Sequence, residues 1–206
     1  MSTLPFSTFD LQTHEIEAMT HIFDNLKQRF GVSYDTNFTY DFSALEIFRN
    51  RKITPGPAIR ITNAFQSFYL AFVLVGYSYA YGRRYSYGLT YEYQTWATIP
   101  SKKDFGHMLV QPETLLDKIH ELINPVEIDF SDDPEFSRNF YVVSADETKA
   151  RLSLNESIRK CIKNINVKDF IIEFLRDTIV IGNRKTIEVD SALSFAKFMD
   201  DLSKEI

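Results

Sequence analysis

Tyrosines are the residues of this chain with the clearest capacity for molecular contact. Eight of the eleven lie between Phe68 and Ile99, together with the only tryptophan. A tyrosine offers a large rigid ring with a polar hydroxyl, which suits contact with a protein or stacking on an unpaired base. The candidate interaction surface consists of Tyr77, Tyr79, Tyr81, Arg83, Arg84, Tyr85 and Tyr87.

Histidine with a carboxylate is the second combination that could do chemistry, as the acid or base of a hydrolase. His107 lies close in sequence to Asp104 and Glu113, and this proximity alone motivates an enzymatic alternative. No nucleophile and base occur at the spacing of a known motif, so we expect no catalytic residue. We also expect no cofactor, because the chain has no Gly-rich phosphate-binding pattern.

Metal chemistry has little support in the sequence. His14 and His21 lie seven residues apart on a predicted helix, whereas a metal pair needs three or four, so both are expected at the surface. The acidic residues 131–135 lack the spacing of a calcium loop. An acidic helix cap followed by Pro134 explains them better.

Two further candidates have ordinary structural explanations beside the functional ones. Arg49, Arg51 and Lys52 form a basic cluster before a predicted loop at residues 54–57. The cluster could bind phosphate, or it could be a solvated connecting segment without a binding role. Cys161 lies on the apolar side of a predicted helix, so we expect a buried thiol rather than a reactive one.

Composition limits the class of protein. The chain has 206 residues, a net charge of −5 and a pI near 5.4, which disfavours broad nucleic-acid binding. One cysteine excludes an internal disulfide, and residues 1–10 have no signal-peptide pattern. We therefore expect a cytoplasmic protein with a protein partner, with nucleic-acid binding a less favoured alternative.

The elements that hold the tyrosines are two long strands. Residues 68–75 are continuously apolar, and strict alternation follows on both sides of Gly82, which predicts a β-hairpin. If odd residues pair with odd, Tyr81 faces Tyr85 and Tyr79 faces Tyr87, which would make a tyrosine ladder. No charge occurs between Arg60 and Arg83, a span long enough for a membrane helix, but period-two tyrosines favour strands.

The remaining chain reads as alternating helices and strands. Further strands are expected at residues 59–65, 105–110, 126–130, 140–143, 169–175 and 178–182. Helices are expected at 13–30 with Thr13 as cap, at 112–123, from Pro134, from a capping box at Ser153–Glu156, and from Asp190 or Ser191. Asp146 and Glu147 read as a turn.

These elements predict an α+β fold, with a mainly antiparallel sheet and a long Tyr-rich hairpin packed against three to four amphipathic helices. Residues 1–12 read as a tail and residues 13–206 as a single domain, with a subdivision near 111–125 as an alternative.

Several motifs together resemble an uncharacterised bacterial soluble domain that often follows one or two transmembrane helices. They are the segments 26–31, Asn63, 77–79, 93–95, 110–113 and 134–140, followed by Asp146, Glu147 and Arg151. The most specific of these is Pro134-Glu135-Phe136-Ser137-Arg138. The resemblance implies a cytoplasmic, membrane-adjacent domain without assigned activity. For this chain we expect membrane association only through a partner.

The chain departs from this resemblance at Gly76, where such proteins usually have an acidic residue, and it lacks the flanking membrane helices. The leading functional hypothesis is a non-catalytic interaction or ligand-sensing module. The alternatives are single-stranded nucleic-acid binding through the hairpin and a hydrolase that uses His107.

Overall fold

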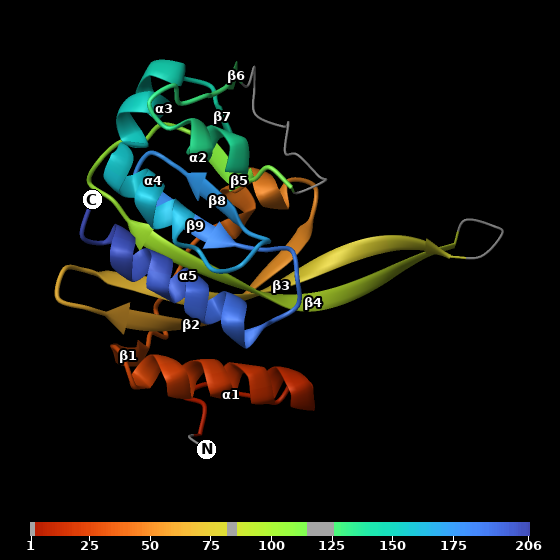
Figure 1. Cartoon of the computed structure of the whole chain (residues 1–206). Coiled ribbons are helices and arrows are strands. Elements are labelled where there is room, and N and C mark those ends of the chain that lie inside the picture. The colour runs from red at the N-terminus through yellow and green to blue at the C-terminus, as the bar shows by residue number, and fades with distance from the viewer. Residues whose placement is uncertain (1–2, 82–85, 115–125) are drawn as a thin grey trace.

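The computed structural model describes residues 3–81, 86–114 and 126–206, with side-chain surroundings for all of these except 79–81, 86 and 87. A single antiparallel sheet of nine strands, in the order β1-β2-β3-β4-β9-β8-β5-β7-β6, forms its centre (Figure 1). The strands are β1 (Gly31–Tyr34), β2 (Lys52–Thr62), β3 (Ser67–Tyr81), β4 (Ser86–Pro100), β5 (Met108–Pro112), β6 (Val126–Glu127), β7 (Phe140–Ser144), β8 (Ile171–Phe174) and β9 (Thr178–Gly182). The predicted α+β class and antiparallel sheet are confirmed.

Two layers cover the two faces of this sheet. The helices α1 (Thr13–Lys27), α2 (Pro134–Asn139), α3 (Glu147–Ser153), α4 (Glu156–Lys163) and α5 (Val189–Leu202) contribute buried side chains to a core on one face. Residues 35–51, called the strap here, cover the other face and include the short 3₁₀ helices Phe42–Ala44 and Glu46–Phe48. Trp96 is fully buried under the strap, with its ring 4.8 Å from that of Phe48.

The first helix begins at the predicted residue but has a different cap. Gln12, not Thr13, is the N-cap residue, and its backbone N–H donates to Glu15 Oε2 over 2.8 Å. The helix ends at Lys27 rather than at residue 30, because the chain turns there to enter β1. Upstream of it, Leu4 is buried in the core.

The loop predicted at residues 54–57 is wrong, since these residues belong to β2. A register shift between Pro55 and Ala58 marks a bulge that accommodates the two prolines. β1 pairs only with residues 59–62, so this part of β2 lies at the sheet edge. An edge strand tolerates proline because the missing N–H has no strand partner there.

The long hairpin is confirmed, but its tyrosines do not form one ladder. Tyr79 pairs with Gly88 and Tyr81 pairs with Ser86, so odd residues oppose even ones. Four residues therefore connect the strands, and an even number excludes the odd-with-odd register. Tyr77 shares a face with Thr90, whereas Tyr91 shares the opposite face with Gly76.

The predicted start of a helix at Pro112 is wrong, because Pro112 is the last residue of the buried strand β5. The rest of that predicted helix, from residue 115 onward, and His120 lie outside the described residues. β5 itself begins at Met108 rather than at residue 105.

The last third of the chain follows the prediction with local changes. The hairpin of β8 and β9 is confirmed, as is helix α2, whose cap Asp133 accepts from the Phe136 N–H at 3.1 Å. The turn predicted at Asp146 is the cap of α3. α3 runs through Ser153, so Asn155 caps α4 in its place.

The cap of the last helix differs from the prediction as well. α5 has Glu188 as its N-cap residue, whereas Asp190 and Ser191 lie inside the helix. Ser191 is buried there, and its hydroxyl donates to Glu188 Oε2 over 3.1 Å.

None of the helices in the described ranges combines the length and apolar character that crossing a bilayer requires.

Candidate functional site

The most distinctive feature of the molecule is the outer part of the β3–β4 hairpin, which projects from the body as a two-stranded ribbon (Figure 1). We call residues 77–81 and 86–91 the arm. β2 pairs with β3 only as far as Gly76, and β9 pairs with β4 only at residues 96–100. Among the described residues, neither edge of the arm therefore has a neighbouring strand.

The structure places part of the predicted interaction surface on this arm. Tyr77 is half-buried at its base, while Tyr79, Tyr81 and Tyr87 lie in its strands by register. Arg83, Arg84 and Tyr85 lie outside the described residues.

Two exposed residues of the arm were not among the sequence candidates. Leu89 is 57% exposed and Tyr91 is 42% exposed. Their period-two spacing puts both on one face of the ribbon, which is the sequence signal that could have identified them.

The base of the arm is held by the basic cluster. The guanidinium carbon of Arg51 lies 4.7 Å from the centre of the Tyr77 ring, and Lys52 Nζ lies 5.8 Å from that of Tyr91. These are cation–π contacts on opposite faces of the ribbon. Arg49 forms an ion pair with Glu46 at 3.2 Å. The cluster predicted to be a phosphate site or a connector is thus engaged within the fold.

A chain of hydrogen bonds connects this base to the buried tryptophan. The Gln94 amide donates to the Tyr77 hydroxyl, and Trp96 Nε1 donates to Gln94 Oε1 over 3.2 Å. Burial raises the pKa of Tyr77, more than the nearby Arg51 lowers it. The phenol therefore stays protonated at neutral pH, and the root of the arm is anchored in the core.

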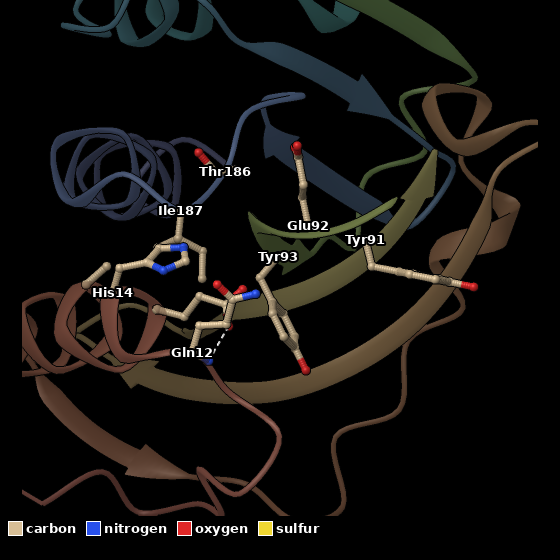
Figure 2. A pocket seen from close by; sticks show the side chains of 9 residues that line it. Gln12, His14, Tyr91, Glu92, Tyr93, Thr186 and Ile187 are labelled. Atoms are coloured by element: carbon tan, nitrogen blue, oxygen red, sulfur yellow. Dashed lines mark hydrogen bonds between the residues drawn. The ribbon is translucent and has the colours of Figure 1, made fainter. Parts of the chain in front are cut away.

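A hollow of about 230 Å³ lies on the helical side of this base, between the start of α1, β4 and residues 186–187. Figure 2 shows that the side chains of Tyr91 and Glu92 point away from His14. Burial raises the pKa of Tyr93, and the negative charges of Glu15 and Asp10 add to the shift. A neutral phenol and an imidazole thus line the hollow, but they do not point toward each other.

His107 has a carboxylate partner that the sequence did not indicate. His107 Nε2 lies 2.8 Å from Glu173 Oε1, and the Glu173 side chain is fully buried in β8. The proposed pairing with Asp104 is wrong, since Asp104 binds Lys149 and the Gly106 N–H. Those contacts hold the pKa of Asp104 below its usual value. Glu113 follows β5, where its backbone N–H donates to Asn139.

One feature of the sequence could have singled out Glu173 as a buried carboxylate. It is the one charged residue in the apolar run 170–175, and a buried carboxylate in a central strand is costly unless it is bonded. Sequence alone could not pair it with His107, because 66 residues separate them.

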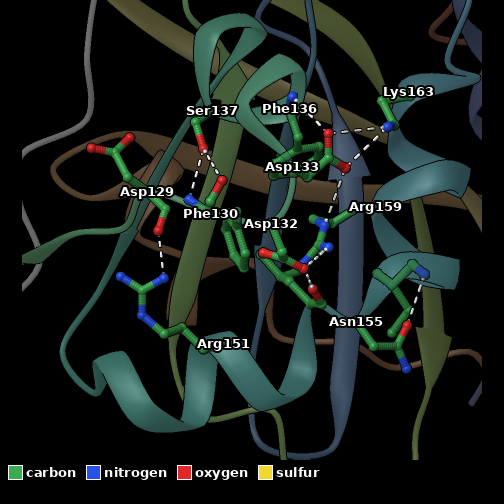
Figure 3. Close-up of polar contacts among 12 residues, drawn as sticks. Asp129, Phe130, Asp132, Asp133, Phe136, Ser137, Arg151, Asn155, Arg159 and Lys163 are labelled. Atoms are coloured by element: carbon green, nitrogen blue, oxygen red, sulfur yellow. Dashed lines mark hydrogen bonds and ion pairs between the residues drawn. The ribbon is translucent and has the colours of Figure 1, made fainter.

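The most specific segment of the stated resemblance forms a structural cluster around Phe130 (Figure 3). Arg159, whose side chain is 5% exposed, pairs with Asp132 at 2.6 Å and Asp133 at 3.3 Å, and its guanidinium carbon lies 4.7 Å from the Phe130 ring centre. Ser137 Oγ accepts from the Phe130 N–H over 2.7 Å. These contacts join α2 and α4, which identifies the acidic segment as a helix start.

Cys161 and the two histidines of α1 have the burial that the sequence predicted. Burial raises the pKa of the Cys161 thiol, and the charges of Asp201 and Glu205 raise it further, so the thiolate is disfavoured. His14 and His21 are exposed. Within residues 3–81, 86–114 and 126–206, no three histidine, cysteine or acidic side chains gather as a metal site.

Comparison with protein-family models, with curated proteins and with solved structures finds no match for this chain. The resemblance to a bacterial soluble domain therefore stays a prediction. Function has to be argued from the geometry of the arm and of the buried carboxylate.

Proposed function

We propose that this chain is a protein-interaction module whose binding element is the arm. A partner protein would add an extended segment to one open edge of the ribbon, as in other cases of strand addition. The observation that carries the proposal is that β3 beyond Gly76 and β4 before residue 96 pair with each other but with no further strand among the described residues.

The arm has a physical reason to accept a further strand. A two-stranded ribbon is marginally stable in water, whereas three strands with an apolar face are stable. The unpaired edges present backbone N–H and C=O groups that an incoming strand can bond. The apolar side chains Leu89 and Tyr91 would supply contact area on one face of the new sheet.

The geometry of the arm supports binding of single-stranded nucleic acid less well than binding of a protein. Arg51 and Lys52, the described cations at the arm, already stack on Tyr77 and Tyr91. The net charge of the chain is −5, which opposes approach of a phosphate backbone.

Site-specific photo-crosslinking in an extract of the source cells tests the proposal. p-Benzoylphenylalanine at position 89 should capture a protein partner, and mass spectrometry should locate the crosslinks in one extended segment of it. The matched control carries the same group at position 152, because Leu152 is 78% exposed on α3, outside the arm.

The outcomes separate the candidate functions. Crosslinks from position 89 to a second copy of this chain would identify the partner as the protein itself. Crosslinks only to nucleic acid, or no protein captured above the level at position 152, would refute the proposal.

A further inference from the structure

A second site, independent of the arm, lies where residues 104–107 meet the end of β8. His107, 32% exposed, lines an open hollow of about 530 Å³ together with Gly106, Asp146, Lys149, Leu175, Arg176 and Asp177. The imidazole therefore has one side toward the buried Glu173 and another toward solvent.

Glu173 is held as a buried acceptor. Its Oε1 accepts from His107 Nε2 at 2.8 Å and from the Glu46 backbone N–H at 3.1 Å. Its Oε2 is buried and has no hydrogen-bond partner in the described chain. A buried carboxylate oxygen without a donor is unfavourable, and such groups occur preferentially at functional sites.

The bond to Glu173 sets the tautomer of His107. A carboxylate can only accept, so Nε2 carries the proton and Nδ1 of the neutral ring has a free lone pair. This is the arrangement in which a buried acid orients a histidine base.

The backbone around His107 is fixed on both sides. Gly106 has a φ of +72°, and its N–H donates to Asp104 Oδ1 over 2.9 Å. The His107 carbonyl accepts from Ser144 Oγ at 3.0 Å. A rigid base is a condition for efficient proton transfer, because the acceptor must lie within hydrogen-bond reach.

We propose that His107, positioned by Glu173, is a general base that hydrolyses small carboxylic esters carrying one negative charge. Nδ1 takes a proton from a water molecule while the water oxygen bonds to the acyl carbon. The bond from that carbon to the alkoxy oxygen then breaks, and His107 returns the proton to the leaving alcohol. An acid and an alcohol are the products.

The charges around the hollow determine the substrate class. Arg176 is exposed and forms no ion pair with another described residue, so it can bind an anionic group. Lys149 is already paired with Asp104. Asp146 and Asp177 also border the hollow, so the formal charges of its lining cancel, and Arg176 alone can pair with a single carboxylate but not with a phosphate dianion.

The test uses the full chain with the 4-nitrophenyl monoester of succinate. We expect kcat/KM to fall about a hundredfold or more in His107→Gln, the range for loss of a general base, and to fall in Glu173→Gln as well. His14→Gln is the matched control, because His14 is an exposed histidine outside the hollow. Arg176→Gln should raise KM for the succinate ester relative to neutral 4-nitrophenyl acetate.

NMR spectroscopy shows whether Glu173 positions the His107 ring or only stabilises the fold. Glu173→Gln keeps an acceptor for the Glu46 N–H, but its amide can donate to Nε2 and so shift the proton to Nδ1. Imidazole ¹⁵N chemical shifts should show Nδ1 unprotonated in the wild type and protonated in this variant. Unchanged hydrolysis in His107→Gln, or a wild-type ring protonated at Nδ1, would overturn the proposal. A chain shortened in the arm should keep the same esterase activity, because the hollow contains no arm residue, so failure of one proposal leaves the other standing.

Discussion

At the scale of single residues, Gly182 explains how the buried tryptophan fits on the sheet. An ideal Cβ at this position would lie 2.3 Å from Trp96 Cδ2 and 2.8 Å from the Thr95 carbonyl oxygen. The indole therefore occupies the space that any other side chain would fill. A backbone atom is among the contacts, so the clash cannot be relieved by a side-chain rotation alone.

We expect Gly182→Ala to lower the free energy of unfolding by about 1–3 kcal/mol, the range for overpacked cores. Urea denaturation followed by tryptophan fluorescence measures it. Gly31→Ala is the control, because a Cβ there would meet Thr62 O at an ordinary 3.5 Å. Equal stability of both variants would contradict this account of the Trp96 site.

Asp133 shows how charge at one residue couples stability to pH. Burial alone would raise its pKa, but the donors Lys163 and the Phe136 N–H, with the charge of Arg159, outweigh burial and hold the pKa below its usual value. A lowered folded-state pKa stabilises the protein above the unfolded value of about 3.9. This stabilisation is lost as the pH falls through the lower folded-state pKa.

We expect Asp133→Asn to remove part of the loss of stability on acidification below about pH 4. Asparagine is also a good N-cap residue, so helix α2 keeps its start and the charge is the main change. Urea unfolding at a series of pH values measures the effect. Lys163→Met should act in the same direction by raising the pKa of Asp133. An Asn variant with the acid dependence of the wild type would refute the assignment.

At the scale of elements, the two candidate caps of α4 can be compared directly. The Asn155 side chain accepts from the Ile158 N–H over 3.0 Å, whereas Ser153 is the last residue of α3. We expect Asn155→Ala to cost about 1 kcal/mol of stability, as for other N-caps. Ser153→Ala should change stability by less than about 0.5 kcal/mol. Thermal unfolding of both variants shows which residue caps α4. A larger loss of stability in Ser153→Ala than in Asn155→Ala would favour Ser153, the cap predicted from the sequence.

Strands in which apolar and polar residues alternate, and helices in which apolar residues recur at helical spacing, could be predicted from the sequence. The long hairpin, the β8–β9 hairpin and α5 were found this way. Residues 52–58 were missed because proline and glycine indicate a loop unless a sheet edge and a bulge accommodate them. The hairpin register depended on the length of a connection that alternation does not reveal.

The candidate functional residues were harder to predict than the elements. The arm could be proposed from its tyrosines, but the absence of neighbouring strands depends on the order of the whole sheet. The same holds for His107 and Glu173, which meet only because β5 pairs with β8. Local sequence contains no information on which distant strands become neighbours.

At the scale of the whole molecule, the body and the arm are separable. Two cores on the two faces of the sheet stabilise the body, and neither includes a described side chain beyond Tyr77 on β3 or before Tyr93 on β4. Replacing residues 78–89 by Asn-Gly would join Tyr77 to its partner Thr90 through a two-residue turn. The shortened chain should therefore keep the fold of the body.

Partner capture by this shortened chain is the most direct measurement of the central claim. The full-length and shortened proteins, each carrying the same photo-crosslinking group at the arm residue Tyr91, are compared in one extract. We predict that the full-length chain captures a protein partner and that the shortened chain captures at most one tenth as much. Equal capture by both proteins, with the body folded in each, would show that the arm is not the binding element.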